Sequence, residues 1–218
     1  MSIFKRLLAF TILLAWCAVL LGYRIARTDS SAYTFLAWNL FLATVPLVAA
    51  ASLLSMHRAR GPATLQLLAF AVWLLFLPNA PYILTDFIHL KESESIPLWY
   101  DIALLASGAG TGVLFAYAST AYVQAVVADR LGRLAGWAVA FVAFVLSGFG
   151  IYLGRFLRWN SWDALTEPAR VFHDIVPRVV DPLAHLGTLG VTLIYGVGLT
   201  LGYAAVRSIP PPRVRDEE

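Results

Sequence analysis

The sequence contains few charged residues and almost no cysteine. Of its 218 residues, 13% are charged and 60% are hydrophobic, whereas soluble domains carry about 25% charged residues. The mean hydropathy is +0.73, and long stretches have no polar face. These values exclude a soluble globular domain. Cys17 is the single cysteine, which excludes an intrachain disulfide and leaves the redox compartment undefined.

Short motifs that identify common catalytic centres are also absent. The sequence has no Walker loop, no HExxH, no paired CxxC and no nucleophile motif. It shows no internal repeat and no series of acidic residues through its apolar segments, and the inner halves of those segments look purely apolar. Enzymatic activity is therefore left open, no cofactor is indicated, and transport is not favoured.

The distribution of basic residues indicates a membrane protein rather than a nucleic-acid-binding one. The sequence pI is about 9.2, but Lys and Arg are spread among short loops, as the positive-inside rule expects. A small majority of them fall on the side of the N-terminus. We therefore predict a multi-pass protein of the plasma or inner membrane, with both termini cytoplasmic and the lipid bilayer as its surroundings.

Six apolar segments are long enough to cross a bilayer, which takes roughly 20 residues of helix. Helices are expected because a single strand leaves its backbone polar groups unsatisfied in lipid. The predicted fold is all-α, a polytopic membrane helix bundle with about six transmembrane helices. The segments are residues 7–23, 33–56, 64–90, 101–127, 134–153 and 184–206.

The first segment has Lys5 and Arg6 before it, as a signal peptide does, but no small-x-small cleavage motif follows. We therefore expect a retained helix. Residues 1–206 are predicted to form a single transmembrane domain with outer loops at 78–100 and 154–183. Residues 207–218 read as a charged, Pro-rich cytoplasmic tail.

The third segment is predicted to be broken at Pro78–Pro81, within "FLPNAPYILTDFIHL". Each proline removes a backbone donor and disfavours a continuous helix. Broken helices at membrane depth often mark binding sites in transporters. If the helix resumes, Asp86 and His89 share one face, as candidate metal ligands or an acid–base pair, or as partners in a structural hydrogen bond or an Asp–Arg pair.

The second outer loop carries two further signals. Arg155 and Arg158 lie three apart and can present two guanidinium groups to one anion; membrane anchoring with ion pairing to Asp86, Asp101 or Asp163 is the alternative. Between 166 and 182, apolar residues recur at helical spacing and predict an amphipathic helix on the outer membrane surface. That helix is either a lid over a site or interfacial packing.

Polar residues from several spans and both outer loops are thus expected in one leaflet. Because consecutive spans alternate in direction, these residues lie on the same side of the membrane whichever side is outside. The candidate binding cluster comprises Asn39, Asn79, Asp86, His89, Asp101, Arg155, Arg158, Asn160 and Asp163.

Four stretches together resemble a known family: "LAWNLFLATVPL", "WLLFLPNAPYILTDFIHL", "WYD" and "GRFLRWNSWD". They are similar to the bacterial membrane family called domain of unknown function 1361, over most of the chain from about Tyr33 to Val206. The resemblance implies a bacterial multi-spanning membrane protein. It carries no activity and assigns no role to any residue.

Three functions are compatible with these patterns. The first is a polar site in the extracytoplasmic leaflet that binds an anionic lipid head group, another small anion or a metal. The second is a small transporter or channel that uses the break at Pro78–Pro81. The third is a non-catalytic membrane component in which the Asp, His and Arg side chains form an ordering ion-pair network.

Overall fold

The computed structural model describes residues 3–92 and 95–209, and within them the chain is helical, without strands. Six of the described helical stretches are long and apolar enough to cross a membrane, which confirms the predicted membrane helix bundle. The long helices are α1 (Ile3–Thr28), α2 (Phe35–Arg58), α3 (Ala63–Phe76), α5 (Leu98–Leu131), α6 (Arg133–Phe156) and α9 (Leu186–Ser208). The shorter ones are α4 (Asn79–Tyr82), the 3₁₀ helix η1 (Ile83–His89), α7 (Asp163–Thr166) and α8 (Pro168–Val180).

Most helices extend beyond their predicted spans. Helix α5 has 34 residues, which at about 1.5 Å per residue exceeds the roughly 30 Å of a hydrocarbon core. The helical hydrogen bonds therefore continue after the apolar run ends, through Asp129 and Arg130. Helix α9 runs to Ser208, so the first two residues of the predicted tail are helical, and residues 210–218 lie outside the described part.

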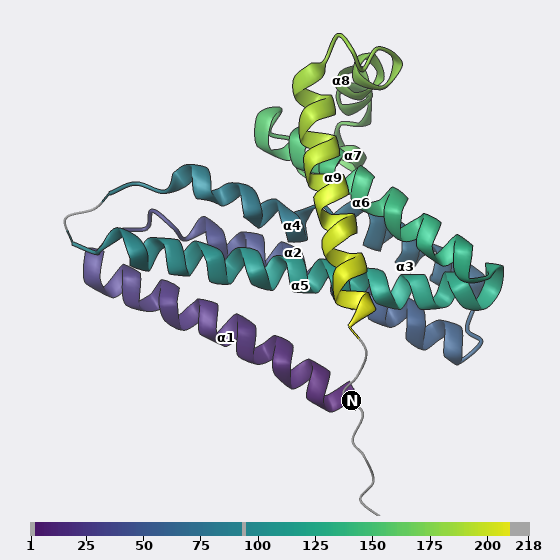
Figure 1. Cartoon of the computed structure of the whole chain (residues 1–218), viewed down its shortest axis with the longest axis horizontal. Helices are drawn as coiled ribbons and strands as arrows, with labels where there is room; N and C mark the ends of the chain where they lie inside the picture. The colour runs from purple at the N-terminus through teal and green to yellow at the C-terminus, as the bar shows by residue number, and fades with distance from the viewer. Residues whose placement is uncertain (1–2, 93–94, 210–218) are drawn as a thin grey trace, which may run out of the picture.

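Helices α2 and α5 form the centre of the bundle, α1 packs on the outside of α5, and α9 packs on α6, in front of it in the view of Figure 1. Leu36 of α2 and Leu105 and Phe115 of α5 are fully buried. A smaller apolar cluster joins α6 to α9 through Phe144 and Tyr203. The outward faces of α1 and α9 leave large apolar side chains exposed, as expected for helices that face lipid tails rather than water.

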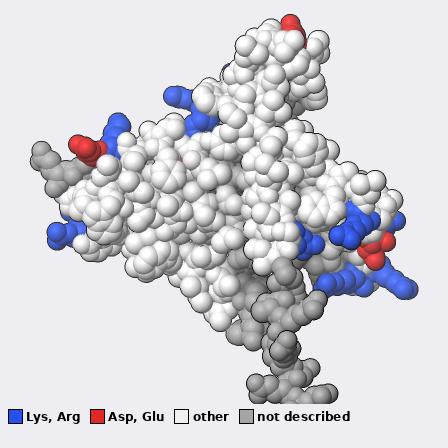
Figure 2. All heavy atoms as spheres, viewed as in Figure 1, with Lys and Arg blue, Asp and Glu red and all other residues white. Residues whose placement is uncertain are grey.

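Charged side chains gather toward the two ends of the long axis, with a few on and beside the part that projects at the top of the view, and the surface between them is largely uncharged (Figure 2). The end at which α1 finishes and α2 begins is called the Asp86 end, because Asp86 lies there. The opposite end, where α5 finishes and α6 begins, is called the Arg130 end. An uncharged band between two charged ends is the pattern of a membrane-spanning protein.

The interruption of the third span lies where the prolines predicted it. Helix α3 ends at Phe76, and α4 and η1 follow. The dihedral angles stay helical, with φ −58° and ψ −27° at Pro78 and φ −58° and ψ −25° at Ile83. The chain therefore tightens toward 3₁₀ geometry and does not unwind. The Ala80 amide accordingly bonds the Leu77 carbonyl, three residues back, at 3.2 Å.

Two glycines let the neighbouring helices approach this interruption closely. A Cβ at Gly112 of α5 would lie 2.2 Å from the Ala80 carbonyl oxygen, and a Cβ at Gly150 of α6 would lie 2.6 Å from Pro78 Cγ. Both distances are impossible for a real side chain. The interruption is therefore held between α5, which approaches the Ala80 carbonyl, and α6, which approaches the Pro78 ring. These contacts fix the direction in which η1 continues.

Candidate functional site

Asp86 is one of the two most deeply buried members of the predicted cluster, with 1% of its surface exposed, as for Asp101. Its carboxylate accepts a hydrogen bond from Arg155 Nη2 at the end of α6, and another from Asn39 Nδ2 of α2 at 2.9 Å. Three separate elements thus meet at one carboxylate. A buried charge is tolerated when it is paired and hydrogen-bonded in this way.

Each of the three nitrogens of the Arg155 guanidinium has a partner in the protein. Its Nε donates to Thr85 Oγ1 at 2.8 Å, its Nη1 lies 3.0 Å from His89 Nε2, and its Nη2 donates to Asp86. Its plane covers the Tyr82 ring at 4.4 Å. Because a guanidinium only donates, His89 Nε2 accepts this bond and its proton is assigned to Nδ1. The Asp–Arg pair that the sequence offered as an alternative is present.

A second buried ion pair lies beside the first. Arg24 of α1 donates to both carboxylate oxygens of Asp101 in α5, at 2.7 and 3.1 Å. Arg24 also covers the Tyr33 ring at 4.0 Å, and the Tyr33 hydroxyl donates to the His89 carbonyl at 3.1 Å. Burial, reinforced by the nearby Asp101 carboxylate and opposed by Arg24, raises the pKa of the Tyr33 phenol, which keeps it a neutral donor.

These contacts link the two ion pairs into one network, from Asp101 through Arg24, Tyr33 and His89 to Arg155 and Asp86. Sequence reasoning did not include Arg24 in the cluster. The available signal was its place at the end of an apolar run, where a charge that cannot reach water needs a partner.

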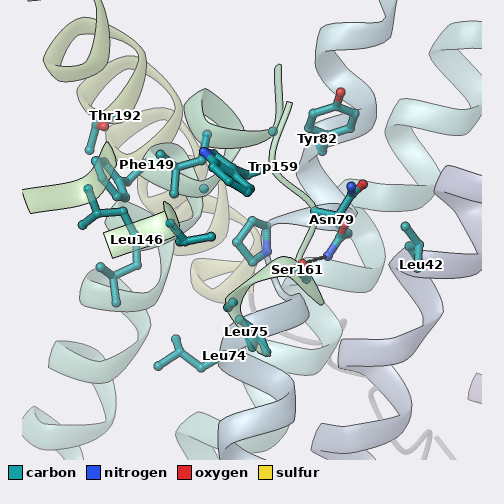
Figure 3. A pocket seen from close by; sticks show the side chains of 18 of the residues that line it. Leu42, Leu74, Leu75, Asn79, Tyr82, Leu146, Phe149, Trp159, Ser161 and Thr192 are labelled. Atoms are coloured by element: carbon teal, nitrogen blue, oxygen red, sulfur yellow. Dashed lines mark hydrogen bonds between the residues drawn. The ribbon is translucent and has the colours of Figure 1, made fainter. Parts of the chain in front are cut away.

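A cavity of about 810 Å³ lies beside this network (Figure 3). Its walls come from α2, α3 and α6, with Leu74, Leu146 and Phe149 pointing into it. Its lining is mainly apolar, and the Asp86 and Arg155 side chains are not part of it. The cavity therefore suits an apolar molecule, with the ion pair behind its wall.

Polar groups line one part of the cavity. Asn79 donates to Ser161 Oγ at 2.8 Å and to the Phe76 carbonyl at 2.9 Å, so its amide ties α4 to the segment between α6 and α7. Asn160 donates to Asp163 through its backbone N–H at 2.6 Å and through its side chain at 3.1 Å. Asn39, Asn79 and Asn160 thus line the cavity. Asp163 does not line it and instead stabilises the segment between α6 and α7 by accepting both hydrogen bonds from Asn160.

The predicted amphipathic helix is α8, and one of its faces covers the cavity. Val171, Ile175 and Val179, spaced four apart, line the cavity. The helix is fastened by Asp174, which accepts a hydrogen bond from Trp159 Nε1 at 2.8 Å. The residues before and after α8 have non-helical φ angles of −133° and −128°. The helix is thus a cover joined to the bundle at both ends by short non-helical links.

Arg158 lies in different surroundings from Arg155. Helix α6 ends at Phe156, and Arg158 takes a left-handed backbone with φ 62°. The Trp159 N–H then bonds the Leu153 carbonyl at 3.1 Å. The Arg158 side chain is exposed and has no hydrogen-bond or ion-pair partner among the described residues. The two guanidiniums therefore do not point at one shared anion.

The described residues contain no group of three or more His, Cys, Asp or Glu side chains that could hold a metal ion. Asp86 and His89, the two candidate ligands, are instead joined through the Arg155 guanidinium. A cation at that position would have to displace Arg155.

The half of the bundle toward the Arg130 end is less apolar than the sequence indicated. Gln66, Thr120 and Gln124 are buried there. Most of their polar atoms are used locally: Tyr203 donates to Gln124 Oε1 at 2.5 Å, and Gln66 Nε2 donates to the Gly61 carbonyl at 2.8 Å. Thr120 Oγ1 has no partner among the described residues. The two glutamines thus stabilise helix contacts, and these isolated groups do not form a continuous polar path through the described part of the bundle.

Comparison with known proteins places the chain in a family. A family described as "Protein of unknown function (DUF1361)" matches residues 38–201. The chain belongs to this family. The matched residues include the interrupted third span, the residues that line the cavity and α8. No curated protein and no solved structure matches the chain.

Proposed function

We propose that this DUF1361 protein binds a membrane lipid in the cavity, in the extracytoplasmic leaflet. The observation that carries the proposal is the mainly apolar cavity of about 810 Å³ under α8. Ligand pockets measure about 300–1,000 Å³ and are mostly apolar with a few polar groups that fix orientation. Among molecules that surround a membrane helix bundle, lipids have that mixture of apolar chain and polar head.

The two parts of the cavity lining match the two parts of a lipid. The leucines and Phe149 contact an apolar chain, whereas the amides of Asn79 and Asn160 and the indole of Trp159 contact the glycerol and head-group region. Arg158 follows the end of α6 next to this polar part, and its guanidinium suits an anionic head group such as a phosphate.

In this proposal, the Asp86–Arg155 pair has an ordering role. All three donor nitrogens of Arg155 bond protein acceptors, so an anion gains little from approaching it. By joining η1, α2 and α6, the pair keeps the cavity wall in place. Buried polar networks can specify one arrangement of helices in this way.

The proposal is tested by filling the cavity. Ala71 of α3 lines it and has an exposed side chain, so Ala71→Trp adds bulk inside the cavity without disturbing a tightly packed contact. We expect the purified variant to retain less than a tenth of the phospholipid that the original protein retains, as counted by native mass spectrometry.

Ala106→Trp is the matched control, because Ala106 is exposed on α5 and does not line the cavity. It should retain lipid at the original level. Equal lipid retention by the two variants would show that lipid is held elsewhere, and the cavity proposal would then be wrong.

A further inference from the structure

A second hollow lies at the Arg130 end, and its lining shares no residue with that of the cavity. It is a groove of about 200 Å³ between α2, α3 and α5, called the Arg130 groove. Its floor is apolar, with Leu53, Phe70 and Val126 among the residues that line it, and Arg130 and Gln66 lie at its polar edge.

Gln66 positions the Arg130 guanidinium. The Gln66 side chain is 5% exposed, and its Nε2 donates to the Gly61 carbonyl at 2.8 Å. Its Oε1 accepts from Arg130 Nη2 at 2.5 Å. The amide therefore has a fixed orientation and uses one of the five N–H donors of Arg130. Arg130 is exposed at the groove, so its remaining donors are accessible to a ligand.

The surrounding charge favours an anion there. Asp129 is the neighbouring acid, and its carboxylate bonds His57 Nε2 at 2.8 Å. Among the described residues, no Asp or Glu pairs with Arg130. Exposed Arg58, Arg60 and Arg133 add positive charge at the same end.

We propose that the Arg130 groove binds an anionic phospholipid, with the phosphate on Arg130 and an acyl chain along α3 and α5. A phosphate accepts parallel N–H bonds from one guanidinium, and basic pockets between spanning helices are known recognition sites for anionic head groups. The groove connects that guanidinium directly to an apolar floor. A free anion gains nothing from contact with the apolar floor, whereas an acyl chain is buried against it, so the occupant is a lipid.

Photo-cross-linking tests this proposal on the full-length purified protein. The probe is a phosphatidylglycerol with a photoactivatable acyl chain, and a phosphatidylcholine with the same chain is the reference. We expect phosphatidylglycerol to label peptides of α3 and α5 near the groove about tenfold more than phosphatidylcholine does. Arg130→Gln should remove most of that preference.

Three variants distinguish a specific binding site from non-specific electrostatic attraction of an anionic lipid. Gln66→Met leaves the net charge unchanged but frees Arg130, and Leu67→Trp fills the groove from an exposed position; each should lower labelling at least fivefold. Arg133→Gln removes one charge at the same end but does not line the groove, and should lower labelling less than twofold.

Several outcomes would overturn the proposal. Equal losses in Arg130→Gln and Arg133→Gln, with none in Gln66→Met, would indicate surface charge alone. Competition by inorganic phosphate, with Leu67→Trp unaffected, would assign the edge to a free anion. The cavity at the Asp86 end is tested separately, because the lining of the cavity and the lining of the groove share no residue.

Discussion

At the Asp86 end, Arg24 and Arg155 lie against carboxylates inside the bundle, whereas at the Arg130 end the arginines are exposed and lack carboxylate partners among the described residues. The side-chain chemistry is the same, but the surroundings differ. A buried guanidinium must be paired, because an isolated buried charge is very unfavourable. An exposed guanidinium needs no partner in the protein and is free for a lipid phosphate.

The difference indicates which residues order the bundle and which contact ligands. Paired arginines at the Asp86 end connect helices that are distant in sequence, and the cavity lies next to them. Arg158, which is exposed at that same end, resembles the arginines of the Arg130 end more than it resembles Arg155. Burial and pairing therefore separate the roles better than position along the membrane axis does.

The largest expected effect comes from breaking one buried pair. Arg24→Met removes the cation and leaves the Asp101 carboxylate buried alone, which costs about 3–5 kcal/mol. Arg133→Met removes an exposed cation from the opposite end and should change stability by less than about 0.5 kcal/mol. Unfolding in mixed detergent micelles, followed by circular dichroism, measures both.

The double variant Arg24→Met with Asp101→Leu supplies the second measurement. Replacing both partners with apolar side chains leaves no unpaired charge, so stability should recover by at least half of the loss. A single Arg24→Met variant as stable as Arg133→Met would contradict the difference between the ends.

A smaller effect is expected from the contact that positions the interrupted span. Gly112→Ala places a methyl group against the Ala80 carbonyl, which cannot move without shifting α4, and we expect a loss of about 1–3 kcal/mol. Gly110→Ala, on the same helix, meets nothing within 4 Å and should be neutral or stabilising by up to about 1 kcal/mol.

Thermal unfolding in one detergent compares the two alanine variants. A Gly110→Ala variant as unstable as Gly112→Ala would show that helix α5 tolerates no alanine for reasons unrelated to α4. The close approach between α5 and the interrupted span would then have no special energetic role.

The six spans and the interruption were predictable because each depends on local properties of the sequence. Apolar run length determines whether a helix crosses the bilayer, and Pro78 and Pro81 remove donors wherever they occur. The gathering of Asn39, Asp86 and Arg155 at one end was also predictable, because consecutive spans alternate direction.

The cavity and the separate surroundings of Arg155 and Arg158 were not predictable. Their spacing of three implied a shared face, but only if α6 continued, and it ends at Phe156. The left-handed position is usually occupied by glycine, so Arg158 gave no signal that the helix stops before it. The cavity depends on how α8 packs onto distant helices, which no local pattern encodes.

The smallest stability effect, and the sharpest comparison, comes from two arginines whose backbone has a left-handed conformation. Arg158 has φ 62° and Arg60, at the Arg130 end, has φ 52°. Each follows the end of a helix, where glycine adopts this backbone without a Cβ penalty. Arg158→Gly and Arg60→Gly should therefore each stabilise the protein, by up to about 1 kcal/mol.

The two glycine variants should differ in lipid selectivity at the cavity. Arg158→Gly removes the guanidinium next to the polar part of the cavity, so the preference of the retained lipid for an anionic head group should fall about tenfold, one charge-assisted hydrogen bond being worth roughly 1.5–3 kcal/mol. Arg60→Gly should leave that preference unchanged, since Arg60 lies at the opposite end.

Native mass spectrometry in mixed phosphatidylglycerol and phosphatidylcholine micelles measures this head-group preference. A parallel sample of Ala71→Trp gives the amount of lipid bound outside the cavity, which is subtracted. If Arg158→Gly gains stability and keeps its anionic preference, the head group does not contact Arg158, and the cavity binds lipid through its apolar chain and the neighbouring amides alone.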